Sequence, residues 1–250
     1  MPLVEALPIR HARPESDPMR ILALETTDRI GSVAALDGAN PLLEMALDES
    51  QRSAQSLAPA VQALLARAAW QPADVSLVAV SIGPGSFTGL RVGVTFAKVF
   101  AYSVGATTLG INTLEAIAAA APEDVSQLTA VMDAQRGDLV VQSFTRQPDR
   151  WLKTTTTPLL LAAEEWIASL PAGAVVAGPG LSKWASRLPT HVRVLDQQLW
   201  TPRAALVGQL ADRYHREGRR DDLWKLVPHY SRRSAAEERW DSRQAPAPKA

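Results

Sequence analysis

The chain has 250 residues, 46% of them hydrophobic, which is enough to bury a real core in one large domain or two small ones. It carries 26 basic and 26 acidic residues, a balance that argues against a protein gripping nucleic-acid phosphates across a broad face by itself. It contains no cysteine, which excludes disulfides, thiolate metal sites and a cysteine nucleophile.

The first half of the chain alternates strand and helix patterns. Residues 1–18 are proline-rich with mixed charge and predict a flexible extension. The expected elements that follow are strands at 21–24, 31–36 and 41–47 forming an antiparallel meander, a helix at 53–69, a strand at 75–82 and a helix from near Gly89 to Val104. Pro59 lies inside the first helix pattern, so that helix begins late or is kinked.

The second half repeats a strand hairpin followed by a strand that enters a Gly-Pro-Gly turn, which hints at two related lobes. The expected elements are strands at 106–110, 128–132, 139–144, 174–177 and 191–195, and helices at 113–121 (capped by Asn112), 162–170 and 204–217. The tail from Ser234 is charged and proline-rich and is expected to be loose.

The most informative stretch is 81–98, SIGPGSFTGLRVGVTFAK, which reads as strand, glycine turn and capped helix. This order places backbone N–H groups at a helix N-terminus, where an anion could bind. The residues for such a contact are Gly83, Gly85, Ser86 and Thr88. However, the turn lacks the lysine–hydroxyl pair of a P-loop and the third glycine of a dinucleotide fingerprint.

The same helix carries small residues at four-residue spacing, namely Gly89, Gly93, Ala97 and Ala101. Glycine costs about 0.5–1 kcal/mol relative to alanine in a helix interior, so two on one face indicate very close packing there. With Leu57, Val61 and Leu64 of the preceding helix, this stripe could form a flat face for a partner protein. Alternatively, both stripes face the chain's own sheet.

Other candidate groups have weaker patterns. Glu25, Thr26 and Thr27, at the end of the first strand, could hold hydrated Mg²⁺ or a γ-phosphate, or they could form an exposed hairpin turn. Asp133 and Asp138 flank Arg136 as an acid–base site or as a charged turn with a local ion pair. The four histidines lack metal-site spacing and no serine occupies a nucleophile elbow. The seven tryptophans are expected to pack in the core and between lobes.

The chain resembles a known family over about residues 19–238. The segments that carry the resemblance are ILALETT (21–27), GSVAAL (31–36), the 81–98 stretch, GINTLEAIA (110–118), DAQRGD (133–138) and PHYSRRSAAE (228–237). Together they are similar to the TsaB (YeaZ) family of tRNA threonylcarbamoyladenosine biosynthesis proteins. Glu25 stands where that family usually has aspartate.

The resemblance implies an α/β fold of the actin-like ATPase (ribonuclease H-like) type, with two lobes of mixed sheets flanked by helices. Its expected boundaries are 19–115 plus about 202–224 for the first lobe, 116–201 for the second and 225–250 for a C-terminal segment. It also implies a cytoplasmic, non-catalytic subunit that dimerises with TsaD, the catalytic paralogue, to add threonylcarbamoyl to the adenosine beside the tRNA anticodon.

The implied partners are a TsaD-like subunit, a TsaE-like ATPase, a second copy when the chain is alone, and tRNA only through the complex, with no membrane. No cofactor or metal of its own is implied, and ATP or ADP with Mg²⁺ enters only in the assembled complex. The implied partner interface is Leu57, Val61, Leu64, Gly89, Leu90, Gly93, Ala97 and Ala101.

One rival remains, a kinase or peptidase of the same fold. As a kinase it would need Glu25 on a metal and the turn Gly178-Pro179-Gly180 beside the adenosine.

Overall fold

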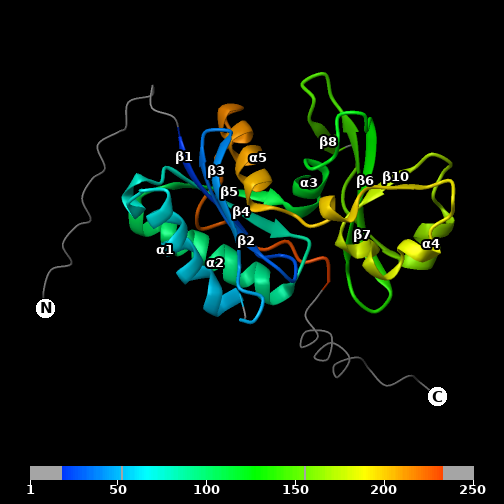
Figure 1. Ribbon diagram of the computed structural model, residues 1–250, viewed down its shortest axis with the longest axis horizontal. Helices are drawn as coiled ribbons and strands as arrows, with labels where there is room; N and C mark the ends of the chain where they lie inside the picture. The colour runs from blue at the N-terminus through cyan, green and yellow to red at the C-terminus, as the bar shows by residue number, and fades with distance from the viewer. Residues whose placement is uncertain (1–18, 52, 155, 233–250) are drawn as a thin grey trace, which may run out of the picture.

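The computed structural model describes residues 19–51, 53–154 and 156–232. It has two lobes side by side, each a β-sheet with helices packed against it (Figure 1). The predicted extension at 1–18 and the tail from Ser234 lie outside the described residues. Within those residues, no helix has the length and apolar character needed to cross a membrane.

The first lobe has a five-stranded sheet in the order β3-β2-β1-β4-β5. Its strands are β1 (Arg20–Glu25), β2 (Ser32–Asp37), β3 (Asn40–Ala46), β4 (Leu77–Gly83) and β5 (Thr107–Asn112). β1, β2 and β3 pair antiparallel, as the predicted meander requires, whereas β1, β4 and β5 pair parallel.

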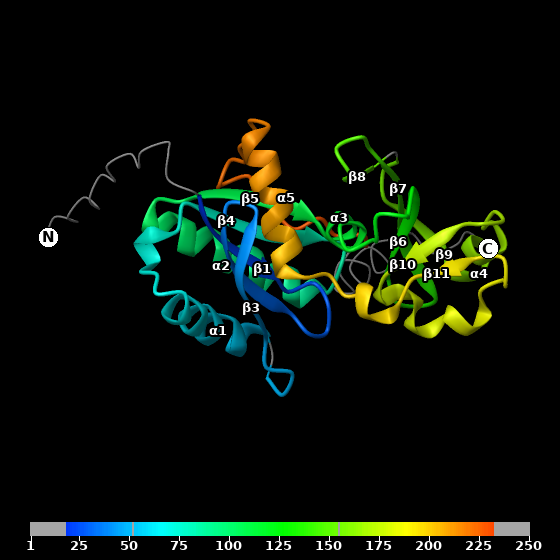
Figure 2. The ribbon, with the colours of Figure 1, turned by 45° about the horizontal axis from the view of Figure 1, so that its top comes forward.

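Three helices cover the two faces of this sheet. They are α1 (Ser53–Arg67) and α2 (Phe87–Val104) on one face, and α5 (Ala204–Arg216) on the other (Figure 2). Residues 21–24 of β1 are all apolar because both faces of the strand are buried: Leu22 packs on the α1–α2 side and Ile21 on the α5 side. α1 contains Pro59 and begins at Ser53, so it does not start late.

The second lobe has a six-stranded sheet in the order β11-β10-β6-β7-β8, with β9 also paired to β7. Its strands are β6 (Gln127–Asp133), β7 (Asp138–Arg146), β8 (Leu152–Thr154), β9 (Leu159–Ala162), β10 (Val175–Ala177) and β11 (Arg193–Val194). Its helices are α3 (Thr113–Ala118) and α4 (Ala163–Ala168). Short 3₁₀ turns lie at Pro72–Asp74, Pro179–Lys183, Ala185–Arg187 and Gln197–Leu199. β8 and β9 were not predicted.

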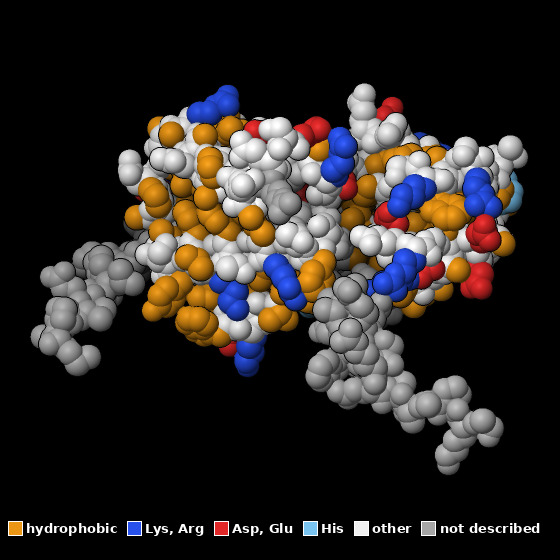
Figure 3. Space-filling model, turned by 90° about the horizontal axis from the view of Figure 1, so that it is seen from below, with side chains coloured by type: hydrophobic (Ala, Val, Ile, Leu, Met, Phe, Trp, Pro, Cys, Tyr) orange, Lys and Arg blue, Asp and Glu red, His pale blue; other side chains and the backbone are white. Residues whose placement is uncertain are grey.

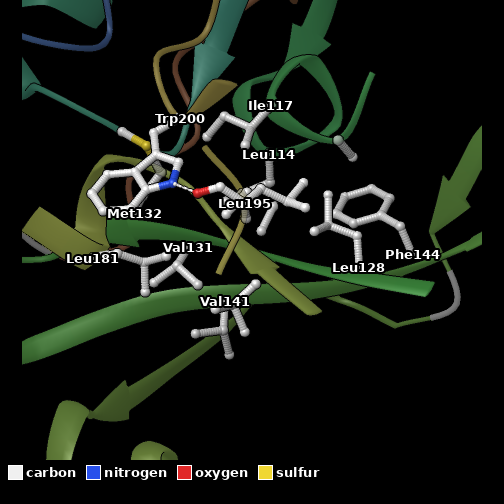
Figure 4. Packing of buried hydrophobic residues seen from close by; sticks show 14 of the residues in the cluster. Leu114, Ile117, Leu128, Val131, Met132, Val141, Phe144, Leu181, Leu195 and Trp200 are labelled. Carbon is white, nitrogen blue, oxygen red and sulfur yellow. Dashed lines mark hydrogen bonds between the residues drawn. The ribbon is translucent and has the colours of Figure 1, made fainter. Parts of the chain in front are cut away.

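The core of the second lobe is a single apolar cluster that α3 joins from the lobe boundary (Figure 4). The indole of Trp200 packs at its edge and donates a hydrogen bond of 2.9 Å to the carbonyl of Leu195. Trp70, Trp166 and Trp200 are buried, as predicted for tryptophan. The prediction is wrong for Trp224, which is 70% exposed, and Trp240 lies outside the described residues.

α2 lies against the turn that follows β1 with almost no space between the two backbones. A Cβ at Gly89 would lie 1.8 Å from the carbonyl oxygen of Thr26, and one at Gly93 would lie 2.3 Å from its Oγ1. Thr26 Oγ1 in turn donates a 2.8 Å hydrogen bond to the carbonyl of Gly89. The small-residue stripe is therefore the contact between α2 and its own sheet.

Glu25 is completely buried at the end of β1, and Thr26 and Thr27 are buried with it, so the expectation of an exposed turn is wrong. One of its carboxylate oxygens accepts hydrogen bonds of 2.5 Å from both the backbone N–H and the hydroxyl of Thr27. The other oxygen accepts a hydrogen bond from the hydroxyl of Ser81 in β4. Burial raises the pKa of Glu25 from 4.5 to about 7, against the opposing effect of the Ser81 and Thr27 hydrogen bonds. The carboxyl group thus joins β1, its turn and β4 from inside.

Replacing Gly89 with alanine tests the close approach of α2. The new methyl group meets a backbone carbonyl that cannot rotate away, so Gly89→Ala should lower the free energy of unfolding by at least about 2 kcal/mol. The matched control is Thr95→Ala on the exposed side of α2, which should change it by under about 0.5 kcal/mol. Urea denaturation measures both; equal stabilities for the two variants would contradict the packing described.

Replacing Glu25 with glutamine tests its buried proton. The folded chain holds this proton up to about pH 7, whereas an unfolded chain releases it near 4.5, so the stabilisation is present below 4.5 and is lost as pH rises through 7. The difference in unfolding free energy between wild type and Glu25→Gln should therefore shift by about 3 kcal/mol against wild type between pH 4.5 and 8. A difference independent of pH in urea titrations would show that Glu25 is ionised in the fold.

Candidate functional site

A cleft of about 810 Å³ opens between the two lobes. The first lobe contributes the β1–β2 turn and the beginning of α2, and the second contributes the β6–β7 turn and the 3₁₀ segments near Pro179 and Gln197. The residues that line it include Thr27, Asp28, Arg29, Gln51, Ser53, Gly85, Ser86, Thr88, Gly89, Met132, Asp133, Gln135, Pro179, Ser182, Gln197, Trp200 and Thr201.

The first-lobe wall is held by contacts between the glycine turn and the β1–β2 turn. The backbone N–H of Ser86 donates a 2.7 Å hydrogen bond to the carbonyl of Thr27, and a Cβ at Gly85 would lie 2.4 Å from the Thr27 side chain. Ser86 also caps α2 by accepting a hydrogen bond from the N–H of Gly89. The start of α2 is therefore fixed rigidly at the cleft.

At the second-lobe wall, Asp133 lines the cleft and forms an ion pair. Lys183 Nζ lies 2.6 Å from Asp133 Oδ2, and Asp133 Oδ1 accepts a 2.9 Å hydrogen bond from the N–H of Gln135. Both oxygens of this carboxylate are thus engaged by donors of the chain itself. A metal ion at Asp133 would first have to displace Lys183. In the described residues, no group of three or more His, Asp or Glu side chains could hold a metal ion.

The structure divides the predicted glycine loop between two sides. Gly85, Ser86 and Thr88 line the cleft. Gly83 faces away from it, into a smaller crevice, and a Cβ there would lie 2.3 Å from the carbonyl oxygen of His229. An anion contact at the loop stays a prediction. Only Gly85, Ser86 and Thr88 lie where they could contact an anion bound in the cleft.

Glu25 is not in the cleft, although the sequence made it the first candidate for a metal. Its side chain is closed off by Thr27 and Ser81, so the hypothesis that it contacts hydrated Mg²⁺ is wrong for this structure. The turn around Arg136 also differs from the local pair that was predicted. Asp133 pairs with Lys183 and Asp138 with Arg232, both far away in the sequence.

The predicted partner interface is not an open face in the single chain. Every residue predicted for it is buried: Leu57, Val61, Leu64, Gly89, Leu90, Gly93, Ala97 and Ala101. The reading in which both stripes face the internal sheet is the one observed, because the apolar sides of α1 and α2 pack on β1, β2 and β4. The outer surface of α2 is made by other residues, Val92, Phe96, Val99, Phe100 and Tyr102, all partly or fully exposed.

Sequence reasoning missed Ser182 and Trp200, which line the cleft, and Lys183, which pairs with Asp133 at the cleft wall. Lys183, Ser182 and Trp200 have no motif of their own, and the signal that could have found the first two is the neighbouring Gly178-Pro179-Gly180 turn. That turn packs on β6, since a Cβ at Gly178 would lie 2.1 Å from the carbonyl oxygen of Val131. It therefore sets the position of the segment that carries Lys183.

The chain is similar in sequence to several known proteins. The family model described as TsaD, tRNA N6-adenosine threonylcarbamoyltransferase, matches residues 29–181. The tRNA threonylcarbamoyladenosine biosynthesis protein TsaB of Escherichia coli is 26% identical over 224 residues, 87% of this chain and 96% of that protein. TsaB of Bacillus subtilis is 32% identical over 121 residues, 48% of this chain and 53% of that protein, so this match spans about half of each.

The fold has a solved counterpart. YeaZ from Pseudomonas aeruginosa superimposes with a TM-score of 0.75 at 24% identity, covering 85% of this chain and 99% of that one. The predicted two-lobed actin-like fold is thereby confirmed. The matching model covers more than half of the chain, and the two relatives described above are both named TsaB. The chain belongs to the TsaD family of this model and, within it, to the TsaB (YeaZ) branch.

Proposed function

We propose that this chain takes part in tRNA threonylcarbamoyladenosine biosynthesis as a non-catalytic subunit that pairs with a TsaD-type catalytic subunit. The names of two relatives support a role in this biosynthesis, because the Escherichia coli protein that matches over 87% of the chain and the Bacillus subtilis protein that matches over 48% are both tRNA threonylcarbamoyladenosine biosynthesis proteins named TsaB. A TsaE-type ATPase and tRNA join through the complex, and the chain pairs with itself when its partner is absent. In this role the chain would act in the cytoplasm.

The observation that carries the proposal is the outer surface of α2, which we call the docking face: Val92, Phe96, Val99, Phe100 and Tyr102. Val99 is 64% exposed and Tyr102 is 58% exposed, while the rings of Phe96 and Phe100 stack 5.9 Å apart. Figure 3 shows the underside of the molecule, where hydrophobic side chains gather over the lobe that carries α1 and α2. An apolar surface of this kind marks a protein interface more often than a monomer surface.

The charges on α1 and α2 favour a different protein, rather than a second copy of this chain, as the stable partner at the docking face. Neither α1 nor α2 contains Asp or Glu, whereas Arg67, Arg91 and Lys98 lie on them. Pairing with a second copy through this face would bring like charges together. A paralogue with the same helix pair and an acidic rim would gain the apolar contact without that repulsion. Self-pairing is accordingly the weaker state.

The cleft supports a non-catalytic role. Asp133 is engaged by Lys183, and Glu25 is sealed from the cleft, so neither carboxylate is free to hold Mg²⁺ or to move a substrate proton. The rival kinase hypothesis depended on Glu25 and loses that residue. ATP or ADP and Mg²⁺ then belong to the assembled complex, and the chain alone needs no cofactor.

Replacing Val99 with aspartate should break the pairing. The charge would be desolvated at the centre of the docking face, so affinity for the cognate TsaD-type subunit should fall by at least about 30-fold. The matched control is Leu159→Asp in β9 of the second lobe, 50% exposed, which should bind like wild type. Calorimetry and size-exclusion chromatography measure both variants, with circular dichroism to show that each is folded. Wild type that never co-elutes with its partner, or Val99→Asp that binds as tightly as Leu159→Asp, would defeat the proposal.

The isolated chain should show no micromolar affinity for ATP with Mg²⁺. The physical reason is that its cleft offers no free carboxylate pair for the metal and keeps Lys183 on Asp133 rather than on a phosphate. Isothermal titration calorimetry on the chain alone provides the measurement, with a cognate TsaD-type subunit titrated in parallel as the positive reference. Micromolar binding to the chain alone would restore the kinase alternative.

A further inference from the structure

The segment after α5 runs from Asp221 to Arg232 along the first lobe and ends against the second; we call it the strap. Its beginning is fixed at the edge of β5. Asp221 pairs with Thr108 in an isolated antiparallel bridge, and its carboxylate accepts a 2.9 Å hydrogen bond from the N–H of Gly110. The strap therefore starts from a defined position beside the first sheet.

The middle of the strap is bound to α2 and to the core. Lys98 Nζ donates hydrogen bonds of 3.2 Å to the carbonyls of Trp224 and Leu226. Leu226 is 5% exposed and packs in the core beneath α1 and α2. This stretch is held by both apolar and polar contacts to the first lobe.

The next residues close over the end of β4. The N–H of His229 donates a 2.6 Å hydrogen bond to the carbonyl of Ile82. The strap comes so near that residue 83 must lack a side chain, and its φ of +123° also favours glycine. Tyr230 then packs against Phe87 in a tilted arrangement, with ring centroids 4.5 Å apart, and accepts a 3.0 Å hydrogen bond from Arg91 Nε.

The end of the strap is joined to the second lobe by an ion pair. Arg232 pairs with Asp138, the first residue of β7, and the two side chains are 23% and 29% exposed. Around this contact the strap, the first lobe and the second lobe enclose a crevice of about 310 Å³, lined by Gly83, Pro84, Asn112, Val140, Pro158, Leu160, His229, Tyr230 and Ser231.

The main chain otherwise passes between the lobes at two places, from β5 into α3 near Asn112 and from Trp200 into α5. Two crossings act as a hinge about which one lobe can rotate. The side-chain amide of Asn112 also donates a hydrogen bond to Gln142 across the lobe boundary. This hydrogen bond lies where the main chain crosses between the lobes, so it resists rotation of one lobe against the other least. A second ion pair, Arg213 with Asp149 at 3.0 Å, joins the lobes on the α5 side.

We propose that the strap is a latch and that the Arg232–Asp138 ion pair sets the angle between the lobes, and with it the width of the cleft. The turn at 83–88 separates the strap crevice from the cleft, since Gly83 and Pro84 line the former and Gly85, Ser86 and Thr88 the latter. Rotation that parts Arg232 from Asp138 therefore moves the walls of the cleft. This inference does not depend on the proposed partner.

Double electron–electron resonance tests the latch on the full chain. Because the chain has no cysteine, Gln62→Cys in α1 and Ala168→Cys in α4, both at exposed positions, place one spin label on each lobe. With the latch intact we expect one narrow distance. Arg232→Asp should increase the population at other distances by up to about fivefold, as for a partly exposed ion pair. Salt near 1 M, where the Debye length is about 3 Å, should act on wild type in the same direction.

The charge swap Arg232→Asp with Asp138→Arg should restore the narrow distance. The matched control is Arg187→Asp, which breaks a 2.9 Å pair with Glu164 inside the second lobe and should leave the distance unchanged. Arg232→Gln serves as a milder variant if the charge reversal destabilises the fold. The latch is disproved if Arg232→Asp and Arg232→Gln keep the wild-type distribution, if the swap fails to restore it, or if Arg187→Asp broadens it equally.

Discussion

The first lobe depends on the contact between the turn after β1 and the backbone of α2. Thr26 reaches the helix carbonyl of Gly89 directly, and no side chain on Gly89 or Gly93 separates the two segments. The same turn fixes the start of α2 at the cleft through Thr27 and Ser86. The close contact between this turn and α2 therefore determines the position of the cleft wall and which side of α2 faces solvent. It also places Phe87 and Arg91 where Tyr230 contacts them.

The second lobe uses a related device with a different result. Gly178 and Gly180 let a Gly-Pro-Gly turn lie against the backbone of β6, as Gly85 and Gly89 lie against the turn after β1. In the second lobe, however, the turn opens a five-residue 3₁₀ segment, whereas in the first it opens the 18-residue α2. Only α2 is long enough to bury one side and present another. The weak internal similarity seen in the sequence thus has a physical basis. The two halves differ because only the first has a long helix after its glycine turn that a partner protein could contact.

The sequence predicted the meander, the three long helices and both glycine turns, because their apolar periods and caps are local signals. It missed β8 and β9, since Leu152–Thr154 and Leu159–Ala162 are short and gain their pairing from β7, which lies elsewhere in the chain. The role of Gly89 and Gly93 could not be decided either, because a stripe of small residues looks the same whether its neighbour is the chain's own turn or another protein. Glu25 and Asp133 were ambiguous for the same reason: the partners that engage them, Ser81 and Lys183, are distant in sequence.

α2 takes part both in the proposed pairing with a partner protein and in the proposed movement of the lobes. Its buried side is committed to the fold by Gly89 and Gly93, and its outer side carries Val99. Arg91 and Lys98, between these two sides, hold the strap through Tyr230 and the carbonyls of Trp224 and Leu226. A protein that packs on the docking face therefore contacts the helix that anchors the latch. Since a rigid helix transmits a small displacement along its whole length, the two proposals taken together link binding at α2 to the angle between the lobes.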